Sequence, residues 1–134
     1  MTAAAARAER RRRRVLLVDD DTSFAEALAS VLDADGRFEV VGRAESGADA
    51  VLLSEQLRPD AILMDLAMPG VDAVEVTREI GRRFPAVRII AVSGSDYSER
   101  ALEVRLAGAL DYIRRTRIQD DLVDALLAAT AGQH

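Results

Sequence analysis

Five short apolar runs alternate along this chain with five segments whose apolar residues recur at helical spacing, and this alternation limits the folds open to it. The apolar runs, which we predict to be strands, cover residues 14–18, 38–43, 61–64, 87–92 and 111–114. The predicted helices cover residues 23–34, 47–57, 72–84, 98–107 and 119–130. The first, third and fourth strands are almost continuously apolar, which is typical of a parallel sheet with helices on both faces. We therefore predict a doubly wound α/β domain with right-handed crossovers.

The composition narrows the chemistry that such a domain could perform. The 134 residues suffice for one sizeable core, because 49% of them are hydrophobic. Cysteine is absent from the sequence, which excludes disulfides, thiolate metal sites and a cysteine nucleophile. The single histidine is His134, so any phosphohistidine chemistry has to come from a partner. No apolar run approaches the roughly 20 residues of a membrane span, and we expect a cytoplasmic protein.

Charge is distributed unevenly along the sequence. Residues 1–14 hold six of the 18 basic residues and one of the 23 acidic ones, so the remainder is more acidic than the net charge of −5 implies. We predict that residues 1–13 form a flexible basic tail and that residues 14–131 form the domain. Contact between this tail and nucleic acid or anionic lipid is the alternative, which the acidic body disfavours because it repels phosphate.

Polar side chains follow the predicted strands at the ends where a doubly wound fold binds its ligands. They are Asp19, Asp20 and Asp21 after the first strand, Asp65 after the third, Ser93 after the fourth, and Arg114 and Arg115 after the fifth. Adjacent carboxylates repel one another, so a folded protein keeps such a cluster ionised mainly by supplying a counter-charge such as a bound cation. Mg²⁺ prefers oxygen ligands and retains some of its waters, and it suits this set of side chains.

Four segments of the sequence occur in the order found in one family. The segments "LLVDDD", "AILMDLAMPGVDA", "IIAVSG" and "AGALDYIRRT" resemble the receiver domain of bacterial two-component response regulators, over residues 14–131. The resemblance implies a flavodoxin-like, CheY-like (βα)5 fold with the strand order 2-1-3-4-5. It also implies a phosphorelay switch rather than an enzyme with turnover on an external substrate. A histidine kinase or a histidine phosphotransfer protein would donate the phosphoryl group to an aspartate.

The resemblance also implies roles for the acidic residues. Asp65 matches the phosphoacceptor, which would become an aspartyl phosphate. Asp20 would bind Mg²⁺ directly and Asp19 through water, while Asp65 and the backbone carbonyl of Ala67 would complete the protein ligands. Asp21 falls at a variable position of the family and is expected to begin the next helix, where an acidic residue interacts well with the helix dipole.

Three further residues match positions that respond to the phosphoryl group. Ser93 matches the hydroxyl that hydrogen-bonds the group, and Tyr112 matches the aromatic switch, although a half-buried strand tyrosine fits its pattern equally well. Arg115 stands where the family has a lysine that contacts the phosphoryl oxygens, and Thr116 and Ala73 stand where proline and glycine are usual. Arginine keeps the charge but has a larger, planar group. The sequence contains no lysine, so an arginine-biased genome and an atypical switch both remain open.

Three other functions are compatible with parts of this pattern. A haloacid-dehalogenase-type phosphatase would use Asp19 as its nucleophile together with Asp21. Its late acidic pair could only be Asp120 and Asp121, which begin the last predicted helix, and Asp65 would have no role. A flavodoxin-like electron carrier would need a Ser/Thr/Gly-rich phosphate loop where three aspartates stand. A pseudo-receiver, acting as a phosphorylation-independent interaction module, is the strongest alternative, because the arginine in the lysine position favours it.

The extent of the sequence bears on how such a domain would signal. The chain ends about where the fifth helix of a receiver ends, so we expect a stand-alone receiver without a DNA-binding domain, whose output passes through protein binding. The resemblance places the responsive surface on the fourth helix, fifth strand and fifth helix, from about Ser98 to Ala129. That face would bind the kinase, a downstream protein target or a second copy of the chain as a homodimer.

Overall fold

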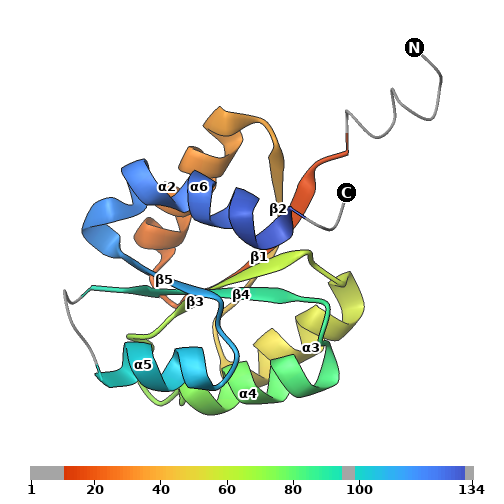
Figure 1. The fold of residues 1–134 in the computed structure, drawn as a ribbon, viewed down its shortest axis with the longest axis vertical. Helices are drawn as coiled ribbons and strands as arrows, with labels where there is room; N and C mark the ends of the chain where they lie inside the picture. The colour runs from red at the N-terminus through yellow and green to blue at the C-terminus, as the bar shows by residue number, and fades with distance from the viewer. Residues whose placement is uncertain (1–10, 95–98, 132–134) are drawn as a thin grey trace.

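The sheet of this protein has five parallel strands in the order β2-β1-β3-β4-β5 (Figure 1). The computed structural model describes residues 11–94 and 99–131, and elements are labelled as in Figure 1. The strands are β1 (Arg13–Val18), β2 (Phe38–Ala44), β3 (Ala61–Asp65), β4 (Arg88–Ser93) and β5 (Asp111–Arg114). The predicted doubly wound fold and its strand order are confirmed.

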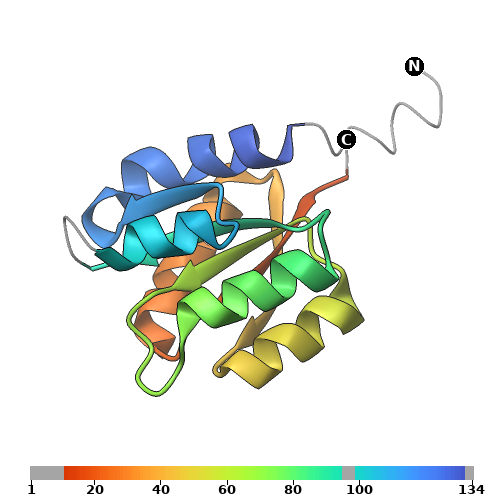
Figure 2. The same ribbon diagram turned by 60° about the horizontal axis from the view of Figure 1, so that its bottom comes forward.

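Helices lie against both faces of this sheet, which gives a three-layer domain (Figures 1 and 2). One face is covered by α2 (Thr22–Asp35) and α6 (Ile118–Thr130). The other is covered by α3 (Gly47–Leu57), α4 (Ala73–Arg83) and α5 (Glu99–Leu106). Because both faces are covered, the polar ends of the parallel strands remain the place where a ligand can reach the sheet.

The central strands are apolar at successive positions because they bury side chains on both faces. In β1, Val15 and Leu17 pack in the core beneath α2 and α6, whereas Leu16 and Val18 pack in the core beneath α3, α4 and α5. Every residue of β3 is buried, including the aspartate with which that strand ends. The two cores therefore hold the carboxyl ends of β1 and β3 side by side.

Most of the predicted elements differ from the observed ones by a residue at one or both ends, and one short helix was not predicted at all. A 3₁₀ helix, η1 (Arg115–Arg117), separates β5 from α6, and a turn this short has no apolar period by which the sequence could reveal it. Strand β1 begins one residue earlier than predicted, because the Arg13 N–H donates to the carbonyl of Arg37 over 2.9 Å. Ser98, at the predicted start of the fourth helix, lies outside the described residues, and α5 is described from Glu99.

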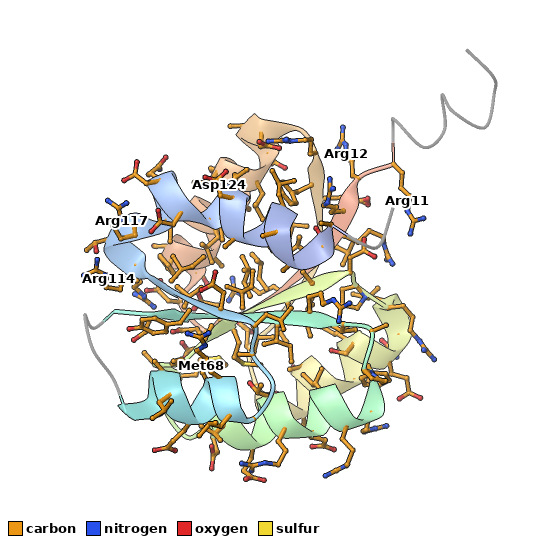
Figure 3. The ribbon with its side chains drawn as sticks, in the orientation of Figure 1. Arg11, Arg12, Met68, Arg114, Arg117 and Asp124 are labelled. Carbon is orange, nitrogen blue, oxygen red and sulfur yellow. The ribbon has the colours of Figure 1, made fainter. Side chains whose placement is uncertain are left out.

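The described part of the predicted basic tail lies far from the carboxyl ends of the strands. Residues 1–10 lie outside the described residues. Arg11 and Arg12 precede β1, at the opposite end of the sheet from Arg114 and Arg117 (Figure 3). Across residues 11–94 and 99–131, none of the helices combines the length and the apolar character needed to cross a membrane.

Candidate functional site

Three carboxylates lie together at the carboxyl ends of β1 and β3. Asp19 and Asp65 are buried, with 1% and 3% of their surface exposed, whereas Asp20 is exposed. Each of the three offers an oxygen within 4.8 Å of the others. The structure thus brings together the three aspartates that the sequence analysis selected as metal ligands, one of them also as the phosphoacceptor. Their individual roles remain predictions.

Backbone hydrogen bonds from neighbouring strands fix the two buried aspartates. The Asp19 N–H donates to the carbonyl of Ala44 at the end of β2, over 2.9 Å. Asp65 pairs with Val92 of β4 in the parallel register, and the next residue, Leu66, donates its N–H to the Val92 carbonyl over 3.0 Å. Asp65 is therefore carried by β3 itself, and Asp19, directly after the end of β1, is tied to the end of β2.

The Asp19 carboxyl has an unusual protonation equilibrium. Burial raises its pKa from 3.8 to about 6, chiefly because desolvation disfavours the charged form, and the nearby negative charge of Asp65 adds to the effect. Two interactions oppose this shift. The Asp21 N–H donates to Asp19 Oδ1 over 2.8 Å, and the Arg115 guanidinium supplies positive charge. A second cation at this edge would favour the ionised form further.

Arg115, the residue directly after β5, brings positive charge to the cluster. Its Nη2 lies 3.4 Å from Asp65 Oδ2, and its Nη1 lies 3.7 Å from Asp21 Oδ2. The guanidinium carbon is 4.0 Å from the centre of the Phe24 ring. The expectation that Asp21 begins a helix is confirmed, since it caps α2 by accepting a hydrogen bond from the Phe24 N–H over 3.1 Å. Its ion pair with Arg115 has no counterpart in the sequence analysis.

The remaining predicted site residues lie around this cluster. Ser93 is the last residue of β4, is buried, and pairs with Arg114 of β5 in the sheet register. The Ala67 N–H donates to Asp65 Oδ1 over 3.0 Å, so the residue predicted to offer its carbonyl also orients the carboxylate. Tyr112 is half-buried on β5 and packs against the core beneath α3, α4 and α5. It therefore lies on a strand of the predicted switch face, where its side chain is partly exposed.

Sequence reasoning missed Arg43, which secures the loop that carries the acidic residues. From the end of β2, its Nε donates to the Asp19 carbonyl over 3.2 Å and its Nη2 donates to Thr22 Oγ1 over 3.1 Å. Arg43 also forms an ion pair with Glu45. The sequence holds one signal of this role, a basic residue at the carboxyl end of a strand. The groups that accept its hydrogen bonds can be identified only once β1 and β2 are known to be neighbours.

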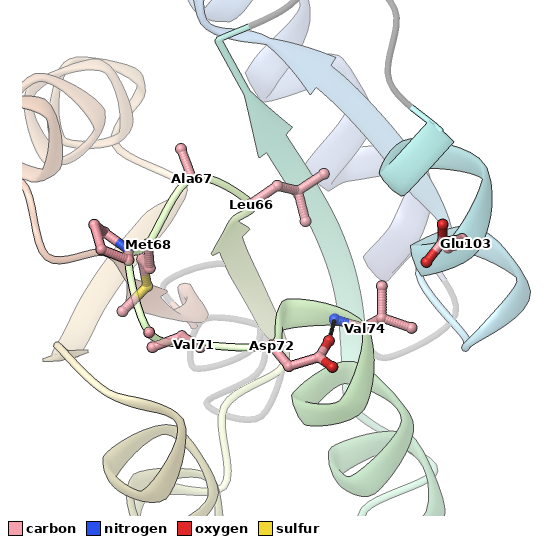
Figure 4. A pocket seen from close by; sticks show the side chains of 9 residues that line it. Leu66, Ala67, Met68, Val71, Asp72, Val74 and Glu103 are labelled. Atoms are coloured by element: carbon pink, nitrogen blue, oxygen red, sulfur yellow. Dashed lines mark hydrogen bonds between the residues drawn. The ribbon is translucent and has the colours of Figure 1, made fainter.

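A hollow of about 780 Å³ begins at Leu66, directly after the buried Asp65. Its walls are the loop from β3 to α4 and the start of α4, with Glu103 of α5 on the opposite side (Figure 4). The Asp72 carboxylate is turned toward α4, where its Oδ1 accepts a hydrogen bond from the Val74 N–H over 3.1 Å and caps the helix. The hollow therefore leaves open space along the loop that follows Asp65.

The side chains at this edge fit a magnesium ion. The ligand atoms on offer are carboxylate oxygens, which this hard cation prefers. Asp19 Oδ2 is buried and has no hydrogen-bond partner among the described residues, so it has an unused capacity to accept. Asp19, Asp20 and Asp65 could hold the ion together with the backbone carbonyl of Ala67.

A parallel βα domain with clustered carboxylates and a cation at the carboxyl ends of its strands is the arrangement predicted for a receiver domain, and sequence comparison assigns the chain to that family. The response regulator receiver domain family matches residues 15–127. The chain belongs to this family of two-component systems, as its motifs predicted. Membership argues against the phosphatase and the electron carrier. It leaves the pseudo-receiver open, because a pseudo-receiver shares the fold.

Named relatives of this chain are bacterial regulators. It is 38% identical over 106 residues to the transcriptional regulatory protein LiaR of Bacillus subtilis, an alignment that covers 79% of this chain and 50% of LiaR. It is 36% identical over 109 residues to the transcriptional regulatory protein DegU of Brevibacillus brevis, covering 81% of this chain and 46% of DegU. The chain thus spans about half the length of these curated relatives.

Solved structures of receivers superpose closely on this one. A two-component response regulator of the LuxR family from Aurantimonas is 31% identical, with a TM-score of 0.84 that covers 92% of this chain and 88% of that one. The response regulator domain of Thermotoga maritima CheB is 28% identical, with a TM-score of 0.82 that covers 90% of this chain and 98% of that one. The likeness extends over nearly the whole domain.

The raised pKa of Asp19 predicts how stability changes with pH in metal-free protein. Between pH 4 and pH 6 the folded state keeps a proton that the unfolded state has released, so the contribution of Asp19 to the free energy of unfolding falls as pH rises. We predict that Asp19→Asn unfolds at a higher urea concentration than the wild type at pH 7.5 in EDTA. The gain should be about 2–3 kcal/mol and should shrink toward zero near pH 4. An equal difference at both pH values would contradict this cause.

Proposed function

We propose that this chain accepts a phosphoryl group from the phosphohistidine of a partner kinase or phosphotransfer protein onto Asp65, and that the phosphorylated form changes its binding to other proteins. The observation that carries the proposal is the burial of the Asp65 carboxylate together with its hydrogen-bonding and ionic contacts. Its buried carboxylate has one oxygen held by the Ala67 N–H and the other facing the Arg115 guanidinium, beside two further carboxylates. An oriented nucleophile next to a cation suits phosphoryl transfer.

The proposed step is an in-line displacement at phosphorus. An Asp65 oxygen forms the new O–P bond while the P–N bond to the partner's imidazole breaks, and the imidazole nitrogen keeps that electron pair and takes a proton from water. Bound Mg²⁺ would offset the negative charge of the phosphoryl oxygens. Arg115 offsets the charge of Asp65 from the other side, and the Ala67 N–H keeps the attacking carboxylate in place.

The pseudo-receiver is the second candidate, and the arginine at position 115 is what favours it. The described geometry supports phosphoryl transfer instead, because the Arg115 guanidinium reaches Asp65 and thus supplies the charge expected of a lysine. A guanidinium can also bind two phosphoryl oxygens at once, which an ammonium does not do with the same geometry. We therefore regard Arg115 as a working replacement.

The proposed output surface comprises α5, β5 and α6, from about Ser98, which lies outside the described residues, to Ala129. Its α5 edge carries exposed apolar side chains, with Leu102 60%, Leu106 80% and Leu110 49% exposed. Exposed apolar side chains mark a protein interaction site where they form a continuous patch. This supports contact with the kinase, a downstream protein target or a second copy of the chain, and Tyr112 would link that surface to the site.

Intact-mass measurement after incubation with acetyl phosphate tests the proposed acceptor. We predict one phosphoryl adduct on the wild type in the presence of Mg²⁺, no adduct in EDTA, and no adduct on Asp65→Asn. The Asn side chain keeps the size of Asp65 but removes its nucleophilic carboxylate. A wild type that binds Mg²⁺ yet gains no adduct would favour the pseudo-receiver over phosphoryl transfer.

Backbone NMR spectra test the proposed output surface. On phosphorylation with acetyl phosphate and Mg²⁺, amide resonances on α5, β5 and α6 should shift, because a switch has to alter the surface it presents to partners. Asp65→Asn treated in the same way provides the control. Shifts confined to the residues around Asp65, with every amide of the proposed surface unmoved, would contradict signalling through this face.

A further inference from the structure

Phe24 is an aromatic residue that the proposed chemistry leaves without a role, although its ring lies against the cation of the site. We propose that Phe24 is a positioning residue that holds Arg115 in place against Asp65, an inference that rests on the proposed phosphoryl transfer. The ring would act through Arg115 alone, without touching the reacting groups. Its effect should therefore depend on arginine being present at position 115.

Three groups contact the Arg115 guanidinium from different directions. The ring centre of Phe24 lies 4.0 Å from its central carbon, well inside the distance of about 6 Å at which a cation is attracted to an aromatic face. In addition, Nη1 lies 3.7 Å from Asp21 Oδ2 and Nη2 lies 3.4 Å from Asp65 Oδ2. A planar guanidinium that stacks on a ring can still donate from its edge, and these two nitrogens face carboxylates.

The first turn of α2 supplies two of these three contacts. Asp21 caps the helix by accepting from the Phe24 N–H, so the helix start fixes the carboxylate relative to the backbone that carries the ring. Arg115 begins the short helix η1 after β5. The contact therefore joins the start of α2 to the end of β5, which are far apart in the sequence.

The long Arg115 side chain stays beside Asp65 only if neighbouring groups restrict its rotamers. About 30% of the Arg115 side chain is exposed, and without the ring it would populate further rotamers that point into water. A lysine ammonium has no plane to stack and approaches a carboxylate as a point charge. The ring should therefore matter more for arginine than for lysine at this position.

Loss of the ring should slow phosphorylation of Asp65. With acetyl phosphate, an Asp65 oxygen forms a bond to phosphorus while the P–O bond to acetate breaks, and acetate leaves with that electron pair. The approach of two negatively charged groups is easier when Arg115 is held beside Asp65. A less ordered Arg115 spends less time there, so the rate falls without any change in the reacting groups.

A double-mutant cycle tests this role. The rate of adduct formation with acetyl phosphate and Mg²⁺ is measured by intact mass for the wild type, Phe24→Leu, Arg115→Lys and the double variant. We expect Phe24→Leu to slow the reaction about three- to tenfold in the wild type and less than about twofold in the Arg115→Lys background. Phe24→Tyr keeps an aromatic face and should restore most of the rate.

Phe84→Leu provides a matched control. Its ring also lies near guanidinium groups, those of Arg58 and Arg83 at 5.7 and 5.4 Å, but it follows α4 at the opposite end of the sheet. The same substitution there should leave the rate unchanged. Equal slowing by Phe24→Leu in both backgrounds would show a general structural role and overturn the inference, as would no slowing at all. A wild type without any adduct would instead overturn the proposed function, and the inference with it.

Discussion

The burial of two carboxylates at adjacent strand ends is the constraint on which the rest of this site depends. Asp19 and Asp65 are almost fully buried and close to each other, and burial together with the charge of Asp65 raises the pKa of Asp19 and so disfavours its ionised form. A carboxylate pair of this kind is stabilised by positive charge. The proposed binding of a metal ion and of a phosphoryl group at this site both depend on how that positive charge is supplied.

The chain supplies one such charge itself, through Arg115. The guanidinium faces Asp65 and Asp21 and lies over the Phe24 ring, so α2 and η1 contribute to the site along with the strand ends. The family resemblance leads one to expect a lysine at this position, and the larger planar guanidinium of arginine requires neighbours that can orient it. Arg115 keeps the positive charge at the site, and Phe24 and Asp21 accommodate its larger side chain.

The sequence predicted the strands, the helices and the acidic cluster because these depend on local periodicity and on the rule that parallel strands end at one edge. It predicted Asp21 as a helix start for the same local reason. It did not reveal that Asp21 and Phe24 would meet Arg115, or that Arg43 would secure the loop of Asp19. Those contacts join elements distant in the sequence and depend on side-chain reach, which no periodic pattern encodes. The 3₁₀ helix η1 was not predicted because its three residues are too few to show a repeating apolar pattern.

Calorimetric titration with Mg²⁺ at pH 6 tests the central claim, that the buried carboxylates require a bound cation. Because the pKa of Asp19 is about 6, a substantial fraction of the molecules carry a proton on Asp19 at this pH before the metal binds. We predict saturable binding that releases protons, detected by titrating in two buffers of different ionisation enthalpy. We also predict weaker binding to Asp20→Asn and no proton release from Asp19→Asn. Mg²⁺ binding that is unaffected by either substitution, or the absence of saturable binding to the wild type, would contradict this claim.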